Sequence, residues 1–241
     1  MFLSNSRKFI FIHITKAAGT SITAALEKTM KWNDLVLGST ALGVDLQKHY
    51  LTRFKLQKHS RAIEVLWVIG KKRWENYFTF SFVRHPYSRV LSLYTYVQNQ
   101  VEGKGWKRHL RKIPVLKINR DPVWNWPATT AYLETKNFSE FIRHPNLIWE
   151  PGMKPQVDWL LDQDGQMLVD FIGKVESINE DFKQVMDQIG LDPIPLKKLN
   201  QSRPPERNIP KINEDDYQYL AKHFEQDFKV LDYDPSYRII G

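Results

Sequence analysis

A short turn that contains a lysine, between an apolar run and a helical pattern, constrains the fold of this chain most. Residues 8–30 read KFIFIHITKAAGTSITAALEKTM. Residues 9–12 suit a buried strand and lack the 3.6-residue spacing of a helix, so we expect a central parallel strand there. Small residues then surround Lys16, and the pattern that follows predicts a helix capped by Thr20 or Ser21.

This arrangement of strand, small-residue turn and helix N-terminus predicts an anion site. The backbone N–H groups and the dipole at the start of a helix favour a phosphate, and Lys16 adds a full positive charge. Gly19 allows the backbone to approach a ligand closely. The turn is not a Walker A motif, because in GxxxxGK[ST] the lysine follows the second glycine, whereas Lys16 precedes Gly19. We therefore expect a phosphate-like ligand that need not be ATP.

A second strand and helix follow at residues 78–94, FTFSFVRHPYSRVLSLY. Alternating aromatic and small residues predict a strand over residues 78–83, and Pro86 suits the first turn of a helix. Arg84 therefore lies at the carboxyl end of a strand, where open α/β sheets bind their ligands. Ser92 follows about two helical turns along the next helix, where its hydroxyl can face the same crevice.

These two segments resemble the donor-binding motifs of sulfotransferases. HITKAAGTS is similar to their 5'-phosphosulfate-binding loop, usually close to HxPKTAGTS, and FSFVRHPYSRVLSLY to their 3'-phosphate-binding strand and helix, usually FxFVRNPxxRxxSxY. The resemblance is to the membrane-associated or carbohydrate type in a short bacterial-like form, and residues 169–182 and 199–208 fall in the order that such proteins show. Thr15 replaces the usual proline and His85 the usual asparagine, and neither change removes a group that must contact a phosphate.

The resemblance implies a fold, a donor and a reaction. The fold is α/β, a P-loop-like sandwich with a central parallel sheet flanked by helices. The donor is 3'-phosphoadenosine-5'-phosphosulfate (PAPS), its product is 3'-phosphoadenosine-5'-phosphate (PAP), and the sulfuryl group moves in line to a hydroxyl of a carbohydrate or glycolipid. Lys16 would stabilise the leaving phosphate. The donor-binding residues implied are Lys16, Ala17, Ala18, Gly19, Thr20, Ser21, Arg84, Ser92, Ser202 and Arg203.

A general base is also needed, and the resemblance implies a histidine before the strand that carries the arginine. His59 is the better match, and Ser60 after it is expected to cap the next helix. His49 is the alternative base, on or near the apolar side of a helix expected over residues 45–58. A structural or solvent role is the other interpretation of either ring.

Composition limits the class of protein. At 241 residues the chain suits a single sulfotransferase domain, 1–241, and no run approaches 18 apolar residues. The net charge of +8 favours an anionic partner, such as the donor nucleotide, an acidic acceptor or a membrane surface, whereas no nucleic-acid-binding signature appears. No metal is implied, because HExxH, paired-cysteine and EF-hand patterns are absent. We expect a cytoplasmic protein, with peripheral contact to the inner membrane left open.

Two interpretations are open for the tryptophans in the middle of the chain. Trp106, Trp124 and Trp126 offer faces that stack on sugar rings, next to basic residues that suit an acidic acceptor, or they simply pack their segment onto the domain. These basic residues are Lys104, Lys107, Arg108 and Arg111.

Two other functions remain as alternatives to a sulfotransferase. One is a P-loop-like kinase or nucleotide-dependent transferase, and the other is a non-catalytic glycan- or nucleic-acid-binding protein.

Overall fold

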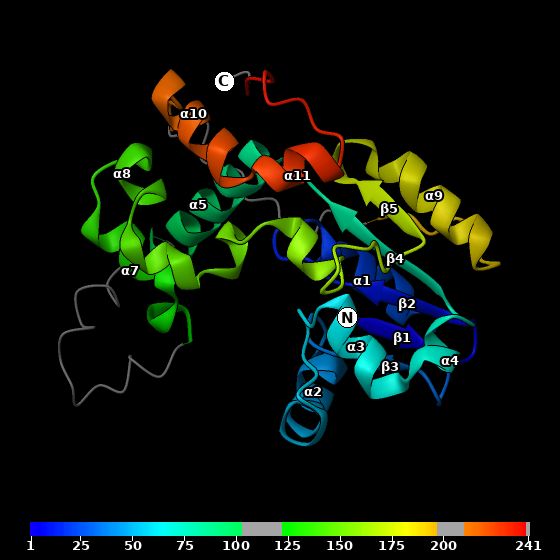
Figure 1. The fold of residues 1–241 in the computed structure, drawn as a ribbon. Helices are drawn as coiled ribbons and strands as arrows, with labels where there is room; N and C mark the ends of the chain where they lie inside the picture. Colours follow the sequence, from blue (N-terminus) through cyan, green and yellow to red (C-terminus); the bar gives the residue numbers. More distant parts are fainter. Residues whose placement is uncertain (103–121, 197–209, 240–241) are drawn as a thin grey trace, which may run out of the picture. The chain divides into compact units, whose positions relative to one another are not determined.

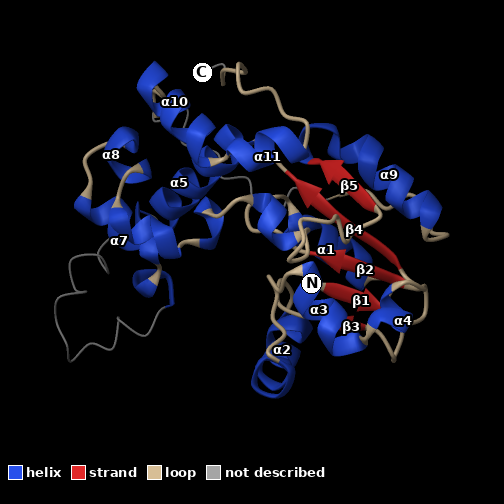
Figure 2. Ribbon diagram, viewed as in Figure 1, coloured by secondary structure: helices blue, strands red, loops and turns tan. Residues whose placement is uncertain are grey.

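The chain divides into two compact units. The computed structural model describes residues 1–102, 122–196 and 210–239. The first unit holds Met1–His85 and Gln156–Asn200, and the second holds Pro86–Pro155 and Gln201–Gly241. All the strands of the described residues belong to the first unit, and the described part of the second consists of helices and loops (Figure 2). The two units are therefore described one after the other.

The first unit is built on a five-stranded sheet in the order β3-β1-β2-β4-β5 (Figure 1). The strands β2 (Phe9–Ile12) and β4 (Phe78–Val83) have the bounds expected from the sequence and pair in parallel, as do β4 and β5 (Phe171–Lys174). In contrast, β1 (Phe2–Ser4) runs antiparallel to both β2 and β3 (Leu35–Val36). The expected parallel centre is thus confirmed, whereas the antiparallel edge is an addition that the sequence pattern does not predict.

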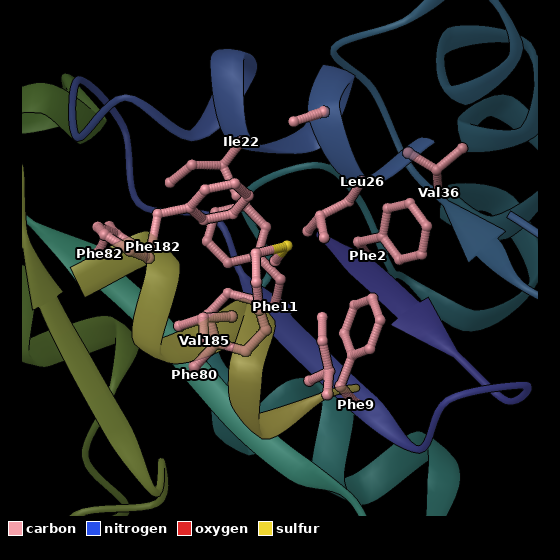
Figure 3. Packing of buried hydrophobic residues seen from close by; sticks show 13 residues of the cluster. Phe2, Phe9, Phe11, Ile22, Leu26, Val36, Phe80, Phe82, Phe182 and Val185 are labelled. Carbon is pink, nitrogen blue, oxygen red and sulfur yellow. The ribbon is translucent and has the colours of Figure 1, made fainter. Parts of the chain in front are cut away.

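The helices α1 and α9 cover one face of this sheet (Figure 3). Their apolar side chains meet the phenylalanines that alternate along β2 and β4, as the two-residue period of a strand requires. Phe80 lies at the centre, with its ring centroid 5.2 Å from that of Phe11 and 5.9 Å from that of Phe9. Such aromatic pairs add about 0.5–1.5 kcal/mol each beyond their buried area. The helices of this unit are α1 (Gly19–Glu27), α2 (Ala41–Phe54), α3 (Ala62–Ile69), α4 (Lys71–Trp74), α9 (Ile178–Gln188) and the 3₁₀ helices η6 (Gln156–Trp159) and η7 (Val175–Ser177).

Asp34 joins the segment after β1 to the segment before β3. Its carboxylate accepts hydrogen bonds from the hydroxyls of Ser4 and Ser6 and from the backbone N–H groups of Ser6 and Lys31, at 2.8–3.0 Å. Burial alone would raise the pKa of Asp34, but these hydrogen bonds outweigh it and hold the pKa below its ordinary value of 3.8. The ionised carboxylate therefore stabilises the antiparallel edge of the sheet.

We expect Asp34→Asn to lower the free energy of unfolding by about 2 kcal/mol near neutral pH, because an amide cannot accept the same set of hydrogen bonds. A pKa lowered by folding contributes stability above the unfolded-state value of 3.8, and this contribution is lost as the pH falls through the folded-state pKa. Urea unfolding of both proteins at neutral and acid pH measures this. The exposed Asp45→Asn is the matched control, and a difference that stayed constant down to acid pH would contradict the assignment.

The second unit is organised around the helix α5 (Pro86–Glu102), which begins at Pro86 as predicted. The rings of Phe138 and Phe141 pack edge-on against Tyr94, with centroids 5.4 Å and 5.0 Å away. Asn213 caps α10 through a hydrogen bond of 2.8 Å from the N–H of Asp216. The remaining described helices are α7 (Pro127–Glu134), α8 (Phe138–Ile142), α10 (Glu214–His223), α11 (Glu225–Val230) and the 3₁₀ helices η3 (Pro122–Asn125), η4 (Pro145–Trp149) and η5 (Pro151–Met153).

Arg89, the second arginine of the motif at residues 80–94, is fully buried in this unit. Its guanidinium donates hydrogen bonds to the carbonyl oxygens of Lys154 at 2.7 Å and Pro151 at 3.0 Å. A buried guanidinium is tolerated only where its N–H groups find acceptors. Arg89 therefore fastens the segment around η5 to α5.

Two of the three tryptophans singled out in the sequence pack within this unit. Trp124 is buried at 6% exposure, and the ring of Trp126 stacks on that of Tyr96 with centroids 5.8 Å apart. The packing interpretation is therefore confirmed for Trp124, whereas for the half-buried Trp126 stacking on a sugar ring stays a prediction. Trp106 and the basic residues 104, 107, 108 and 111 lie outside the described residues. Among the described helices, none is both long and apolar enough to cross a membrane.

Candidate functional site

The loop between β2 and α1 adopts a backbone conformation that suits an anion. Lys16 and Ala18 both have left-handed backbones, with φ of 66° and 57°. For residues other than glycine this costs of order 1–3 kcal/mol, and such strain is concentrated at functional sites. Ala18 is the N-cap of α1 and is followed by helical residues, so successive N–H groups turn toward one concave side, as in the backbone nests that bind anions.

The start of α1 differs from the expectation. The helix begins at Gly19, so Thr20 and Ser21 lie inside its first turn and the N-cap is Ala18, which makes no side-chain cap. The prediction that Thr20 or Ser21 caps the helix is wrong, because the left-handed Ala18 ends the loop earlier. Alanine has no side-chain acceptor for the N–H groups of the first turn, and the N–H of Ser21 donates to the carbonyl oxygen of Ala18 at 3.0 Å. The N-cap side chain therefore leaves room for a ligand at the helix start.

Arg84 follows β4 directly, as predicted, and its backbone is held at both polar atoms. Gln156, which is fully buried on η6, accepts a hydrogen bond from the Arg84 N–H at 2.9 Å and donates one to the Arg84 carbonyl at 2.8 Å. The register pairs Ile12 with Ser81, so the Lys16 loop and Arg84 both follow the carboxyl ends of neighbouring parallel strands. Ligands of open α/β sheets bind at this edge.

The connection between α2 and α3 brings two further side chains to the same loop. The ammonium of Lys58 lies 3.5 Å from the hydroxyl of Thr20, at the long end of the hydrogen-bond range. The Nδ1 of His59 lies 2.8 Å from the carbonyl oxygen of His13, which precedes the loop. Since a carbonyl can only accept, Nδ1 carries the proton, and the lone pair of the neutral ring is at Nε2. His59 is half-buried.

The segment η6 also holds His59 in place. The indole N–H of Trp159 donates to the carbonyl oxygen of His59 at 2.8 Å, three residues after the Gln156 that holds Arg84. The segment η6 therefore holds the backbones of both Arg84, the predicted 3'-phosphate-binding residue, and His59, the predicted base. Sequence reasoning gave no role to His13, Lys58, Gln156 or Trp159. The first two stand inside or beside the recognised motifs, but no local pattern distinguishes the other two.

The expectations for the remaining candidate residues are either wrong or not tested by the structure. His49 is exposed on α2, whose only buried residue is Gly43, so its expected place on an apolar side is wrong. The cap of α3 is Arg61 and not Ser60, whose hydroxyl accepts from the N–H of Gln57 at 3.0 Å instead. Ser92 lies on α5 in the second unit, and Ser202 and Arg203 lie outside the described residues. Within residues 1–102, 122–196 and 210–239, no group of three or more His, Asp or Glu side chains is arranged to hold a metal ion.

Comparison with known proteins supplies independent information. The family model described as "Sulfotransferase family" matches residues 1–234. A protein of Archaeoglobus fulgidus, described as an uncharacterized protein, is 30% identical over 123 residues, which are 51% of this chain and 76% of that protein. No solved structure matches the chain. The matched range of the family includes the Lys16 loop, the segment 58–59 and Arg84 together.

Proposed function

The chain belongs to the sulfotransferase family, and we propose that it transfers a sulfuryl group from PAPS to a hydroxyl of a carbohydrate or glycolipid. The observation that carries the proposal is the left-handed loop at Lys16 and Ala18, which leads into a helix whose N-cap residue makes no side-chain cap. This loop and Arg84 follow neighbouring strand ends. We also propose that the sheet is P-loop-like, because its parallel centre carries the anion loop directly after β2. A cytoplasmic location remains a prediction from the sequence.

The residues of the first unit fit the two anionic ends of PAPS. When bound, PAPS supplies the sulfuryl group and, in its 5'-phosphate, the leaving group. The N–H groups of the loop and the ammonium of Lys16 hold the 5'-phosphosulfate and stabilise the charge that develops on the leaving phosphate. Lys58, next to Thr20, adds a second positive charge on this side, although burial lowers its pKa. The role of Ser92 remains a prediction from the resemblance.

Arg84 fits the 3'-phosphate, because a guanidinium offers a planar fork of donors to a phosphate. Gln156 fixes the backbone from which the side chain extends, so less conformational freedom is lost when a phosphate binds. A 3'-phosphate also distinguishes PAPS from ATP. The proposal therefore assigns donor selectivity to Arg84.

His59 acts as the general base in this proposal. Its Nε2 accepts the proton of the acceptor hydroxyl as the new sulfur–oxygen bond forms, and the electron pair of the broken bond goes to the leaving phosphate that Lys16 stabilises. The hydrogen bond from Nδ1 to the carbonyl of His13 supports this role, because it leaves the basic lone pair on the other nitrogen. The half-buried position keeps the ring accessible to an acceptor.

Ligand selectivity tests the proposal against its alternatives. Thermal unfolding is followed with PAP, with ATP and with single-stranded oligonucleotides, and sulfuryl transfer from labelled PAPS is then screened over neutral and acidic sugars and glycolipids. The expected result is stabilisation by PAP above that by ATP, together with transfer to at least one hydroxyl acceptor. Stabilisation by ATP alone would favour a kinase-like transferase. Stabilisation by glycans or oligonucleotides without PAP binding would favour a non-catalytic binding protein.

We expect Arg84→Ala to weaken PAP binding by about 10- to 100-fold, which is the loss expected for a charge-assisted hydrogen bond. Binding of adenosine 5'-phosphate, which lacks the 3'-phosphate, should change little. Calorimetric titration with both nucleotides measures the difference, and Arg73→Ala is the matched control because Arg73 is exposed on α4. Equal losses for the two nucleotides would show that Arg84 does not contact the 3'-phosphate.

A further inference from the structure

His13 is a buried imidazole that the proposed reaction does not use. It is 2% exposed and lies between the Lys16 loop and His59. Its ring meets that of His59 edge-on, with centroids 4.6 Å apart and planes 73° apart, and it also stacks on the ring of Phe11, with centroids 5.7 Å apart. The Nδ1 of His13 is 3.4 Å from the hydroxyl of Ser39. The ring is therefore held from several directions.

The contact with Gly19 connects this ring to the start of α1. A Cβ atom added to Gly19 would overlap Cδ2 and Nε2 of His13, well inside van der Waals contact. The imidazole thus occupies the space that a side chain would fill at the first residue of the helix. Only glycine fits there while the ring keeps its place. The ring and the start of α1 are therefore in direct contact, so neither can move toward the other without displacing it.

The charge state of His13 is compatible with this packing. Burial first, and then the positive charges of His59, of the Met1 amino group and of Lys58, lower the pKa of His13 well below its ordinary value of 6.5. A neutral ring can lie against His59 while His59 takes up a proton, because the two do not repel each other. His13 is therefore suited to support the base rather than to titrate with it.

We propose that His13 is a positioning residue that couples the conformation of the donor loop to the orientation of the base. On one side its ring is fixed by Gly19 at the start of α1, and on the other side its ring and carbonyl oxygen hold the imidazole of His59. When the donor loop is in its binding conformation, His13 thereby keeps Nε2 of His59 oriented for proton transfer. This inference rests on the proposed function, because it assigns His13 a role between the donor loop and the base of that reaction.

A double-mutant cycle of His13→Ala and Gly19→Ala tests the coupling. His13→Ala should lower kcat by about 10- to 100-fold with little change in the KM for PAPS, because misplacement of a base affects the chemical step. Gly19→Ala alone should lower both turnover and PAP affinity, because its methyl group overlaps the ring. In the His13→Ala background the methyl group has room, so the further loss caused by Gly19→Ala should be much smaller. Losses that simply multiply would overturn the proposal.

A second measurement does not depend on turnover. Nitrogen-detected NMR of the histidine side chains in the ligand-free protein should show His59 protonated at Nδ1. His13→Ala keeps the backbone carbonyl that accepts this hydrogen bond but removes the ring that packs on His59, so relaxation of the His59 ring signals should show increased motion. His13→Gln, which fills more of the vacated volume, is measured in parallel in case the alanine variant fails to fold, and a smaller increase is expected. Unchanged relaxation of the His59 ring in both folded variants would overturn the proposal.

The two hypotheses fail in different ways. If the wild-type protein neither binds PAP nor transfers sulfuryl, the proposed function is wrong, whatever the NMR result. If the wild-type protein is active and both folded His13 variants keep its kcat, the proposed function stands and the positioning role of His13 is wrong.

Discussion

Lys16→Ala is expected to abolish sulfuryl transfer, with a loss of turnover of about 10³-fold or more, while the fold stays intact. Removal of one neutral donor from an anion-stabilising site already costs about 10²- to 10³-fold, and Lys16 supplies a full charge. Lys16 is half-buried in a loop, and alanine meets the same left-handed backbone that lysine already adopts at φ 66°. Single-turnover transfer from labelled PAPS measures the loss, and thermal unfolding checks the fold.

Lys28→Ala is the matched control for this variant. Lys28 is exposed at the opposite end of α1, so the net charge changes equally while the loop is untouched. Its turnover should stay close to that of the wild-type protein. If Lys16→Ala keeps an activity comparable to that of the wild-type protein, the loop does not take part in the transfer, and the main argument for the donor site fails.

His59→Ala is expected to lower turnover by about 10²- to 10⁴-fold, as for other general bases, and to leave PAP affinity nearly unchanged. The reason is that His59 lies outside both phosphate motifs and contributes its Nε2 lone pair to the acceptor rather than to the donor. Single-turnover transfer between about pH 5.5 and pH 9 should also lose the decline at acid pH that protonation of the base causes. PAP binding is measured by calorimetry on the same preparations.

His49→Ala provides the comparison, because it removes the same chemical group ten residues earlier, at an exposed position on α2. We expect its turnover to match that of the wild-type protein. The assignment of the base to His59 fails if His49→Ala shows the larger loss while donor binding stays intact. Equal and strong losses of PAP affinity in the His59 variant would instead indicate a structural role for His59 in the donor site.

The parts of the site that the sequence predicts well are those defined by neighbours along the chain. The Lys16 loop and Arg84 each follow an apolar run directly, and the structure places each of them directly after a strand. Pro86 starts a helix through the restriction of its own backbone, which is a local property. Such features need no knowledge of the rest of the fold.

The predictions that are wrong depend on competition between local alternatives. Thr20, Ser21 and Ser60 all have the residue type that caps helices, yet Ala18 and Arg61 occupy the cap positions. In the first case the left-handed backbone of Ala18 decides where the helix begins, and residue preferences give no reason to expect that conformation for alanine. Likewise, the pattern around His49 predicts that a helix exists, but not its bounds, which are Ala41–Phe54 rather than 45–58, nor how much of α2 is covered by other elements.

Residue patterns along the chain are therefore enough to predict the α/β class, the two strand–helix segments that carry the expected phosphate-binding residues, and the family. Which side chains gather around these segments depends on how the chain packs in three dimensions. His59 contacts His13 across 46 residues, and Trp159 and Gln156 reach His59 and Arg84 across 100 and 72 residues. The physical reason is that periodicity and residue preference act over a few neighbouring residues, whereas these contacts form only when the packing of strands, helices and the η6 segment brings distant backbones together.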